Sequence, residues 1–162
     1  RREVYFKEID GKVYVTKWQC TNEHDVNDVH ILFRFSDLLL IEAEALARQG
    51  KDGALDLLNE FKSSKIPGYA GYTGGDVIGE ILKERRKELT MGYNRFFDLR
   101  RLNMEEAYRT EPTRTIPLDT SVTPGIPQDT YTLPANSPLY VMPFPTKVLL
   151  NDERLESNSM NN

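Results

Sequence analysis

Cysteine is almost absent from this sequence, whose 162 residues contain a single one, Cys20. One cysteine excludes an internal disulfide framework, but it leaves the compartment open because many secreted domains also lack disulfides. The residues before it, Val15-Thr16-Lys17-Trp18-Gln19, do not supply the small and hydrophobic pattern of a lipidation site. We therefore do not expect Cys20 to carry a lipid.

An excess of positive charge is also missing. The chain has 21 Lys+Arg against 25 Asp+Glu, a net charge of −4, so no long-range field favours nucleic acid. The one basic cluster, Lys83 to Glu88, is mixed with acids. Opposite charges lie three residues apart at Glu80 and Lys83, Glu84 and Lys87, and Arg85 and Glu88. We interpret the cluster as a self-neutralised helix face and expect no nucleic-acid partner.

Catalytic and metal-binding motifs are absent too. The sequence has no glycine-rich phosphate loop, no serine elbow and no metal motif, so we expect neither an enzyme nor a cofactor. His24, Asp25, Asp28 and His30 lie close together, but their spacing matches no recognised ligand motif. A solvated loop is favoured there over a metal site.

Among the features that are present, an apolar run from Leu38 to Ala47 is broken only by Glu42 and Glu44. It is too short to span a bilayer. We predict a central helix from about Ser36 to Gln49, with Ser36 as its N-cap and Gly50 as its stop. Because this helix is apolar on nearly every side, we expect protein around it, and both glutamates then need partners.

Three more helices are expected. Asp52 caps the first of them, which ends near Ser64, and the short link through Gly50 makes an antiparallel hairpin similar to a tetratricopeptide unit. No second copy appears at the repeat period, so a solenoid is not expected. Asp76 caps the next helix, which runs to about Met91, and a short helix covers residues 94–102.

Arg85 is the most informative residue of this region. It falls near the middle of an apolar stripe, with Glu88 at the edge. The stripe consists of Val77, Ile78, Ile81, Leu82 and Leu89. A guanidinium stays charged, so Arg85 must reach solvent or meet a carboxylate in a desolvated pair. Candidate partners are Glu42, Glu44, Glu88 and Asp98.

The two ends differ from this helical middle. Residues 3–18 predict a β-hairpin, because Asp10-Gly11 is a strong two-residue turn signal. Residues 103–162 hold all but one of the nine prolines and no long periodic segment, apart from a possible helical turn at 146–150. We thus expect a mainly α fold in which residues 1–30 form a hairpin and loop, 31–102 a helical core, and 103–162 an extended irregular tail packed on that core.

Candidate ligand-binding residues are aromatic, because sugars need exposed aromatic faces beside hydrogen-bonding groups. The candidates are Trp18, Tyr69 and Tyr72. Each has a structural alternative: Trp18 would pack the hairpin against the helices, and the tyrosines would pin the glycine-rich loop Lys65–Gly75.

Three segments together resemble the C-terminal part of the SusD/RagB family. They read FRFSDLLLIEAEALARQG (33–50), GEILKERRKELTMGYNRFFDLRRLN (79–103) and PLYVMPFPTKVLLNDERLESN (138–158). The most specific pieces are Ala43-Glu44-Ala45, Glu84-Arg85-Arg86-Lys87-Glu88-Leu89, Arg95 and Asp98-Leu99-Arg100-Arg101. The chain departs from the family at Gly92-Tyr93, where Glu-Gly is usual, and at Lys147-Val148 and Asn151-Asp152, where Glu-Ile and Asn-Pro are usual.

The resemblance implies a mostly α-helical, tetratricopeptide-based lipoprotein on the extracellular face of the outer membrane. Such a protein binds oligosaccharides or related nutrients without catalysis and passes them to a SusC-like TonB-dependent transporter. Its signal peptide, lipidated cysteine and first helices would lie upstream of Arg1, so we expect this chain to be a fragment.

The resemblance also ranks the partners of Arg85. The family motif falls on Glu44, which makes Glu44 the first choice, and the expected ion-pair network consists of Glu44, Arg85, Glu88 and Asp98. The rival interpretation is a tetratricopeptide-like protein–protein adaptor. An upstream signal peptide with a lipobox would favour the SusD reading, whereas a cytoplasmic start would favour the adaptor.

Overall fold

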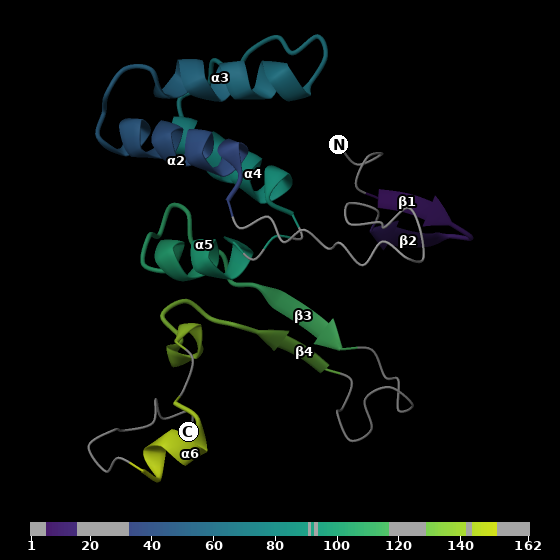
Figure 1. Ribbon diagram of the computed structural model, residues 1–162, viewed down its shortest axis with the longest axis vertical. Coiled ribbons are helices and arrows are strands. Elements are labelled where there is room, and N and C mark those ends of the chain that lie inside the picture. The colour runs from purple at the N-terminus through teal and green to yellow at the C-terminus, as the bar shows by residue number, and fades with distance from the viewer. Residues whose placement is uncertain are drawn as a thin grey trace. The chain divides into compact units, whose positions relative to one another are not determined.

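Helices make up most of the regular structure in the computed structural model, which describes residues 6–15, 33–90, 92, 94–116, 129–141 and 144–151. The chain forms two compact units, residues 1–35 and 36–162. The helices are α2 (Phe35–Arg48), α3 (Ala54–Lys65), α4 (Val77–Glu88), α5 (Asn94–Leu102), the short 3₁₀ helix η1 (Pro138–Tyr140) and α6 (Thr146–Leu149) (Figure 1). The expected mainly α class is confirmed.

The first unit contains a β-hairpin. Strand β1 (Phe6–Ile9) pairs antiparallel with β2 (Lys12–Val15), with Phe6 opposite Val15 and Ile9 opposite Lys12. The turn residues Asp10 and Gly11 have positive φ angles of 50° and 73°. Both positions of a type I′ turn need positive φ, and its twist suits a hairpin. The predicted hairpin is thus present, while Trp18 lies outside the described residues.

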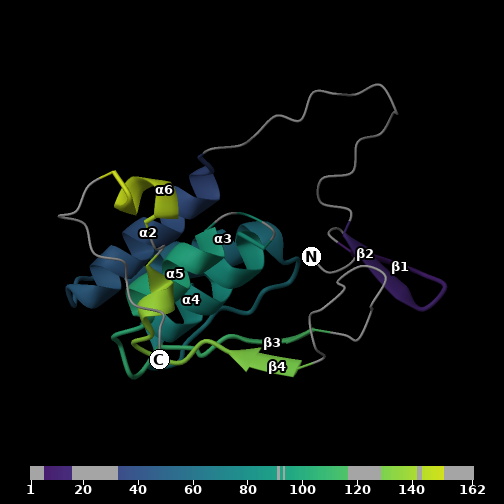
Figure 2. The same ribbon diagram turned by 90° about the horizontal axis from the view of Figure 1, so that it is seen from below.

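In the second unit, helices α2, α3 and α4 share one hydrophobic core, and Figure 2 shows them gathered together. Its buried residues are Leu40 and Ala43 of α2, Leu58 and Phe61 of α3, and Ile81 of α4. Each helix with two core residues spaces them three apart, which places both on one helical face. Gly50, with φ of 62°, ends α2 as predicted, and the N–H of Lys51 donates to the carbonyl of Leu46 at 3.0 Å.

The helix caps agree only in part with those predicted from the sequence. Asp76 caps α4 as expected, since its Oδ1 accepts from the N–H of Gly79 at 2.8 Å. A Cβ on Gly79 would meet the Asp76 carboxylate, so a larger residue there would force the capping side chain to move. Asp52 was wrongly predicted to cap α3, because Gly53 takes the N-cap position with φ of 91° and no side-chain cap bond. Helix α4 also ends at Glu88, short of Met91.

Helix α2 is not surrounded as we expected. Its core side holds Leu40 and Ala43, but Leu38 is 54% exposed, Ile41 is 48% exposed and Glu42 is exposed. Within the described part of the chain this side of the helix is open, so Glu42 does not need a buried partner there. Among the described residues, no helix has the length and apolar character needed to cross a bilayer.

The C-terminal segment contains a strand pair that the sequence analysis did not predict. Strand β3 (Thr113–Ile116) pairs antiparallel with β4 (Asp129–Thr132). A hydrogen bond and an aromatic contact connect the segment to α5 and the residue after it. The N–H of Asn136 donates to Oδ1 of Asn103 at 2.8 Å, and the ring of Tyr140 stacks on Phe96 with centroids 6.3 Å apart. The helical turn expected at 146–150 is present as α6.

Candidate functional site

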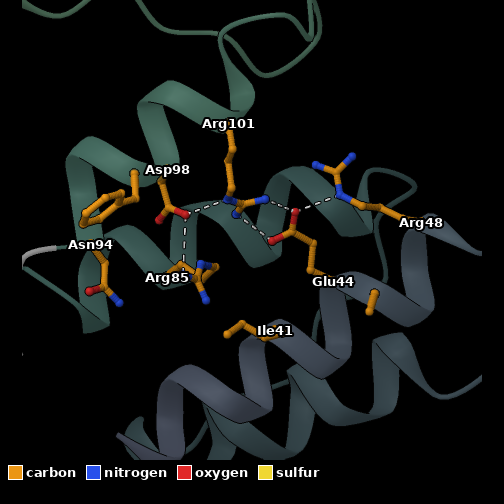
Figure 3. Close-up of a pocket in the computed structure, with 9 residues that line it drawn as sticks. Ile41, Glu44, Arg48, Arg85, Asn94, Asp98 and Arg101 are labelled. Atoms are coloured by element: carbon orange, nitrogen blue, oxygen red, sulfur yellow. Dashed lines mark hydrogen bonds and ion pairs between the residues drawn. The ribbon is translucent and has the colours of Figure 1, made fainter. Parts of the chain in front are cut away.

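A cavity of about 530 Å³ lies between α2, α4 and α5 (Figure 3). It is lined by Ile41, Glu44, Ala45 and Arg48 of α2, Arg85 of α4, and Asn94, Phe97, Asp98 and Arg101 of α5. Pockets for small ligands usually measure roughly 300–1,000 Å³. The volume falls within this range, and the surface exposed to the cavity is mostly apolar although several charged residues line it.

Arg85 lies at the floor of this cavity. Its side chain is 6% exposed, and its Nη1 donates to Oδ1 of Asp37 at 2.6 Å. Nη2 makes a longer bond of 3.5 Å to Oδ1 of Asp98, and the buried Nε has no hydrogen-bond partner among the described residues. Asp37 also accepts from Nδ2 of Asn94 at 2.8 Å. Arg85 thus joins all three helices that line the cavity.

The prediction that Glu44 is the first partner of Arg85 is wrong. Asp37 and Asp98 hold the guanidinium, and only Asp98 was among the alternatives. Glu44 lies seven residues beyond Asp37, which is about 10 Å along a helix. Arg85 is near the C-terminal end of α4 and meets the first turn of α2, so Glu44 is two turns too far along to be its direct partner.

Glu44 is held by two other arginines. Nη1 and Nη2 of Arg101 donate to its two carboxylate oxygens at 2.6 and 2.8 Å, and Nε of Arg48 donates to Oε1 at 2.8 Å. Arg101 also donates from Nε to Asp98 at 2.8 Å. Ion pairs therefore run without a break from Arg48 through Glu44, Arg101, Asp98 and Arg85 to Asp37, as Figure 3 shows for all but the last.

The contacts of this network shift the pKa values of Glu44 and Arg101. Burial alone would raise the pKa of the Glu44 carboxyl, but the hydrogen bonds from Arg101 and Arg48 outweigh it, and the pKa lies below its usual value. The same bond to Glu44 raises the pKa of Arg101. Glu44 is thus a carboxylate at neutral pH.

The sequence analysis missed three members, Asp37, Arg48 and Arg101, as partners. A signal existed for two: Arg48 follows Glu44 by four residues and Arg101 follows Asp98 by three, both helix-neighbour spacings. Glu88, which we had placed in the network, instead has Lys65 Nζ at 3.8 Å. It lies on α4 facing α3, away from the cavity lining.

The loop between α3 and α4 carries Tyr69 and Tyr72. Nζ of Lys62 lies 5.0 Å from the ring centroid of Tyr69 and 5.7 Å from that of Tyr72. Asn59 closes the loop, since its Oδ1 accepts from the Tyr72 N–H at 2.7 Å and from the Tyr69 hydroxyl at 3.2 Å. Both tyrosines are half-buried and fasten the loop to α3.

Lys62 is itself buried and pairs with Glu80. Its burial favours the neutral amine, yet the hydrogen bond to Glu80 prevails and raises the pKa of Lys62. The described residues contain no group of His, Cys, Asp or Glu suited to a metal ion, and His24, Asp25, Asp28 and His30 lie outside them.

A comparison with models of protein families identifies the family of this chain. The model of the SusD family matches residues 6–160. This chain belongs to the SusD family.

One curated relative is the SusD-like protein P38 of Formosa agariphila, which is 36% identical over 102 residues. That match covers 55% of this chain and 20% of the relative, so the chain spans about a fifth of the relative's length. No solved structure matches the chain.

Four of the residues that carry the SusD resemblance lie together in the structure. Glu44, Arg85, Asp98 and Arg101 come from three separate sequence motifs, and all four line the same cavity. Their ion pairs link α2, α4 and α5. In this SusD chain, these four motif residues therefore hold the three helices together through ion pairs.

The stability of this SusD chain should depend on pH through Glu44. Its folded pKa lies below 4.5, so the folded state binds fewer protons than the unfolded state in acid. The stabilisation is fully present above pH 4.5 and is lost as the pH falls through the folded pKa. We expect the stability difference between wild type and Glu44→Gln to shrink below pH 4.5, measured by urea unfolding at several pH values.

Glu42→Gln is the control for this titration, because Glu42 is exposed on the same helix. A difference that shrinks in the same way for Glu42→Gln would show that the pH effect does not depend on the arginine contacts of Glu44. A difference for Glu44→Gln that does not change with pH would contradict the assignment.

Proposed function

We propose that this chain is part of a non-catalytic cell-surface protein that binds oligosaccharides or related nutrients. In this proposal the protein sits on the extracellular face of the outer membrane and delivers its ligand to a SusC-like TonB-dependent transporter. A lipid on a cysteine outside this chain would tether it. The observation that carries the proposal is the SusD family match over residues 6–160.

The test uses a carbohydrate array and two proteins, the full-length protein and residues 1–162 alone. We expect binding by the full-length protein and little by residues 1–162, because this chain spans only about a fifth of a SusD-like relative. Strong and specific binding by residues 1–162 alone would show that the site lies within this chain. Absence of binding by the full-length protein to any glycan would count against the proposal. Co-purification with a TonB-dependent transporter tests the partner.

Within this chain, the loop tyrosines are the candidate ligand contacts that can be examined in the structure. One side of the Tyr69 ring faces the Lys62 ammonium, and Tyr72 packs against the helical core. These contacts support a role in holding the loop. They leave Tyr69 as the better candidate for stacking on a sugar, since its ring is not part of the core.

We expect Tyr69→Ala to weaken glycan binding by the full-length protein about three- to tenfold if the loop contacts the ligand, the range for loss of one aromatic contact. Tyr69→Phe is the matched control, because it keeps the ring and removes only the hydroxyl bond to Asn59. Isothermal titration calorimetry measures both. Unchanged affinity for Tyr69→Ala and Tyr72→Ala would remove the loop from the site.

A second candidate function is a protein–protein adaptor, favoured by the helical hairpin of α2 and α3 and by the exposed apolar residues on α2. The two functions predict different upstream sequences. A signal peptide with a lipobox supports nutrient binding at the cell surface, and a cytoplasmic start supports the adaptor.

A further inference from the structure

Residues 67–75 form the loop between Ile66, which ends α3, and Asp76, which caps α4, and we call this loop the strap. Within the described part of the chain, its backbone makes one hydrogen bond to another main-chain group, from the Tyr69 N–H to the Ile66 carbonyl at 3.2 Å. That bond lies at the start of the strap. The rest of the strap is therefore held in place by side chains.

A single side chain of α3, that of Asn59, makes three bonds to the strap. Its Nδ2 donates to the Tyr72 carbonyl at 3.1 Å, and its Oδ1 accepts from the Tyr72 N–H at 2.7 Å. The carboxamide thus pairs with the backbone of Tyr72 as a residue of a neighbouring antiparallel strand would. Oδ1 also accepts from the Tyr69 hydroxyl at 3.2 Å. The positions of both tyrosines therefore depend on one residue.

The Tyr72 side chain folds back over the end of the strap. Its hydroxyl donates to the Asp76 carbonyl at 3.3 Å, and its ring packs against the core of α2, α3 and α4. A Cβ on Gly74 would lie 2.5 Å from the Tyr72 hydroxyl, whereas a Cβ on Gly75 would have no atom within 4 Å. A side chain at position 74 would therefore displace the tyrosine, and one at position 75 would not.

The two tyrosine rings lie against the ammonium of Lys62 on α3. Its Nζ is 5.0 Å from the Tyr69 ring centroid and 5.7 Å from the Tyr72 ring centroid, and it pairs with Glu80 of α4. The Lys62 side chain is only 8% exposed, because the strap and the helices enclose it. Chemical access to the Lys62 amine therefore reports where the strap lies.

We propose that the strap opens and closes as one unit while the helices stay folded, and that Asn59 is the residue that keeps it closed. Glycines near both ends permit the backbone to turn there, Gly68 with φ of 71° at the start and residues 74–75 at the finish. Once the Asn59 bonds break, both tyrosines are released together, because both depend on that side chain. Such local opening costs less than unfolding of the core. The open strap gives solvent access to the Lys62 amine, the two rings and the Asn59 carboxamide, whether or not the rings contact a glycan.

The test measures how fast acetic anhydride acetylates individual lysines of the folded full-length protein, read by mass spectrometry of its peptides. Asn59→Ala should raise the acetylation rate of Lys62 at least about tenfold, because it removes three bonds that each stabilise the closed strap. Lys83, which is 68% exposed, should react at the same rate in both proteins. Glu60→Ala is the matched control, since Glu60 is the next residue of α3 and is exposed, and it should leave the Lys62 rate unchanged.

A second pair of variants opens the strap without changing Asn59. Gly74→Ala should also speed the acetylation of Lys62, because its Cβ displaces the Tyr72 hydroxyl, whereas Gly75→Ala should not. An unchanged Lys62 rate in both Asn59→Ala and Gly74→Ala would overturn the proposal.

Hydrogen exchange separates opening of the strap from unfolding of the whole unit. In Asn59→Ala, the amide of Tyr72 should exchange faster, while the amide of Ile81, a fully buried core residue of α4, should keep its protection. If Lys62 reacts faster only when Ile81 also loses its protection, the helices unfold with the strap and the proposal is wrong.

Discussion

Arg85→Ala is expected to lower the free energy of unfolding by about 3–5 kcal/mol, the usual cost of removing one partner of a buried ion pair. The Arg85 side chain is 6% exposed, and its partners Asp37 and Asp98 are 21% and 12% exposed. Without Arg85, the bonds to described residues that remain are Asn94 to Asp37 and Arg101 to Asp98. Because neither carboxylate loses every partner, we place the loss near the lower end of the range. Even that is a large share of the roughly 5–15 kcal/mol that stabilises a typical domain.

The neighbouring residue provides the control for this measurement. Arg86 is the next residue on α4, but it is exposed. Arg86→Ala should therefore change the free energy of unfolding by only about 0–1 kcal/mol. Urea unfolding followed by circular dichroism measures both variants. If Arg85→Ala and Arg86→Ala lower the free energy of unfolding by similar amounts, the buried ion pairs of Arg85 do not stabilise the fold.

Glu44→Ala is expected to lower the free energy of unfolding by a comparable amount, also near the lower end of about 3–5 kcal/mol. The Glu44 side chain is 6% exposed and accepts three hydrogen bonds, two from Arg101 and one from Arg48. Its removal takes away the bidentate acceptor of the Arg101 guanidinium, which keeps its bond to Asp98. Arg101 is 39% exposed and can partly turn to water, which limits the loss.

A double-mutant cycle separates this pair from the rest of the network. Arg101→Ala removes the same two bonds from the other side, so the double variant Glu44→Ala/Arg101→Ala should cost clearly less than the sum of the single variants. Glu42→Ala is the matched control, because Glu42 is exposed two residues earlier on α2. A Glu44→Ala variant as stable as Glu42→Ala would contradict the network, as would strictly additive losses. Coupling between Glu44 and Arg85 should be weaker, since Arg101 and Asp98 lie between them.

Features that depend on a few neighbouring residues could be predicted from the sequence. The Asp10-Gly11 hairpin turn, the stop of α2 at Gly50 and the Asp76 cap of α4 are all present in the structure. Each of them is decided within about four residues, by a positive φ angle or by one side chain reaching a nearby N–H. The motifs also pointed to the correct family, because their order and spacing are properties of the chain alone.

Features that depend on which helix faces which could not be predicted in the same way. A helical wheel placed Arg85 on the apolar side of α4, but it could not show which turn of α2 lies opposite. The C-terminal end of α4 lies beside the first turn of α2, so Asp37 accepts a hydrogen bond from Arg85 at 2.6 Å. Glu44, two turns further along α2, accepts from Arg101 of α5 instead. A wheel likewise could not show that Leu38 and Ile41 of α2 stay exposed in this chain. Sequence periodicity describes the faces of one helix, whereas ion-pair partners and burial depend on the offset and orientation between helices, which are set by packing across distant parts of the chain.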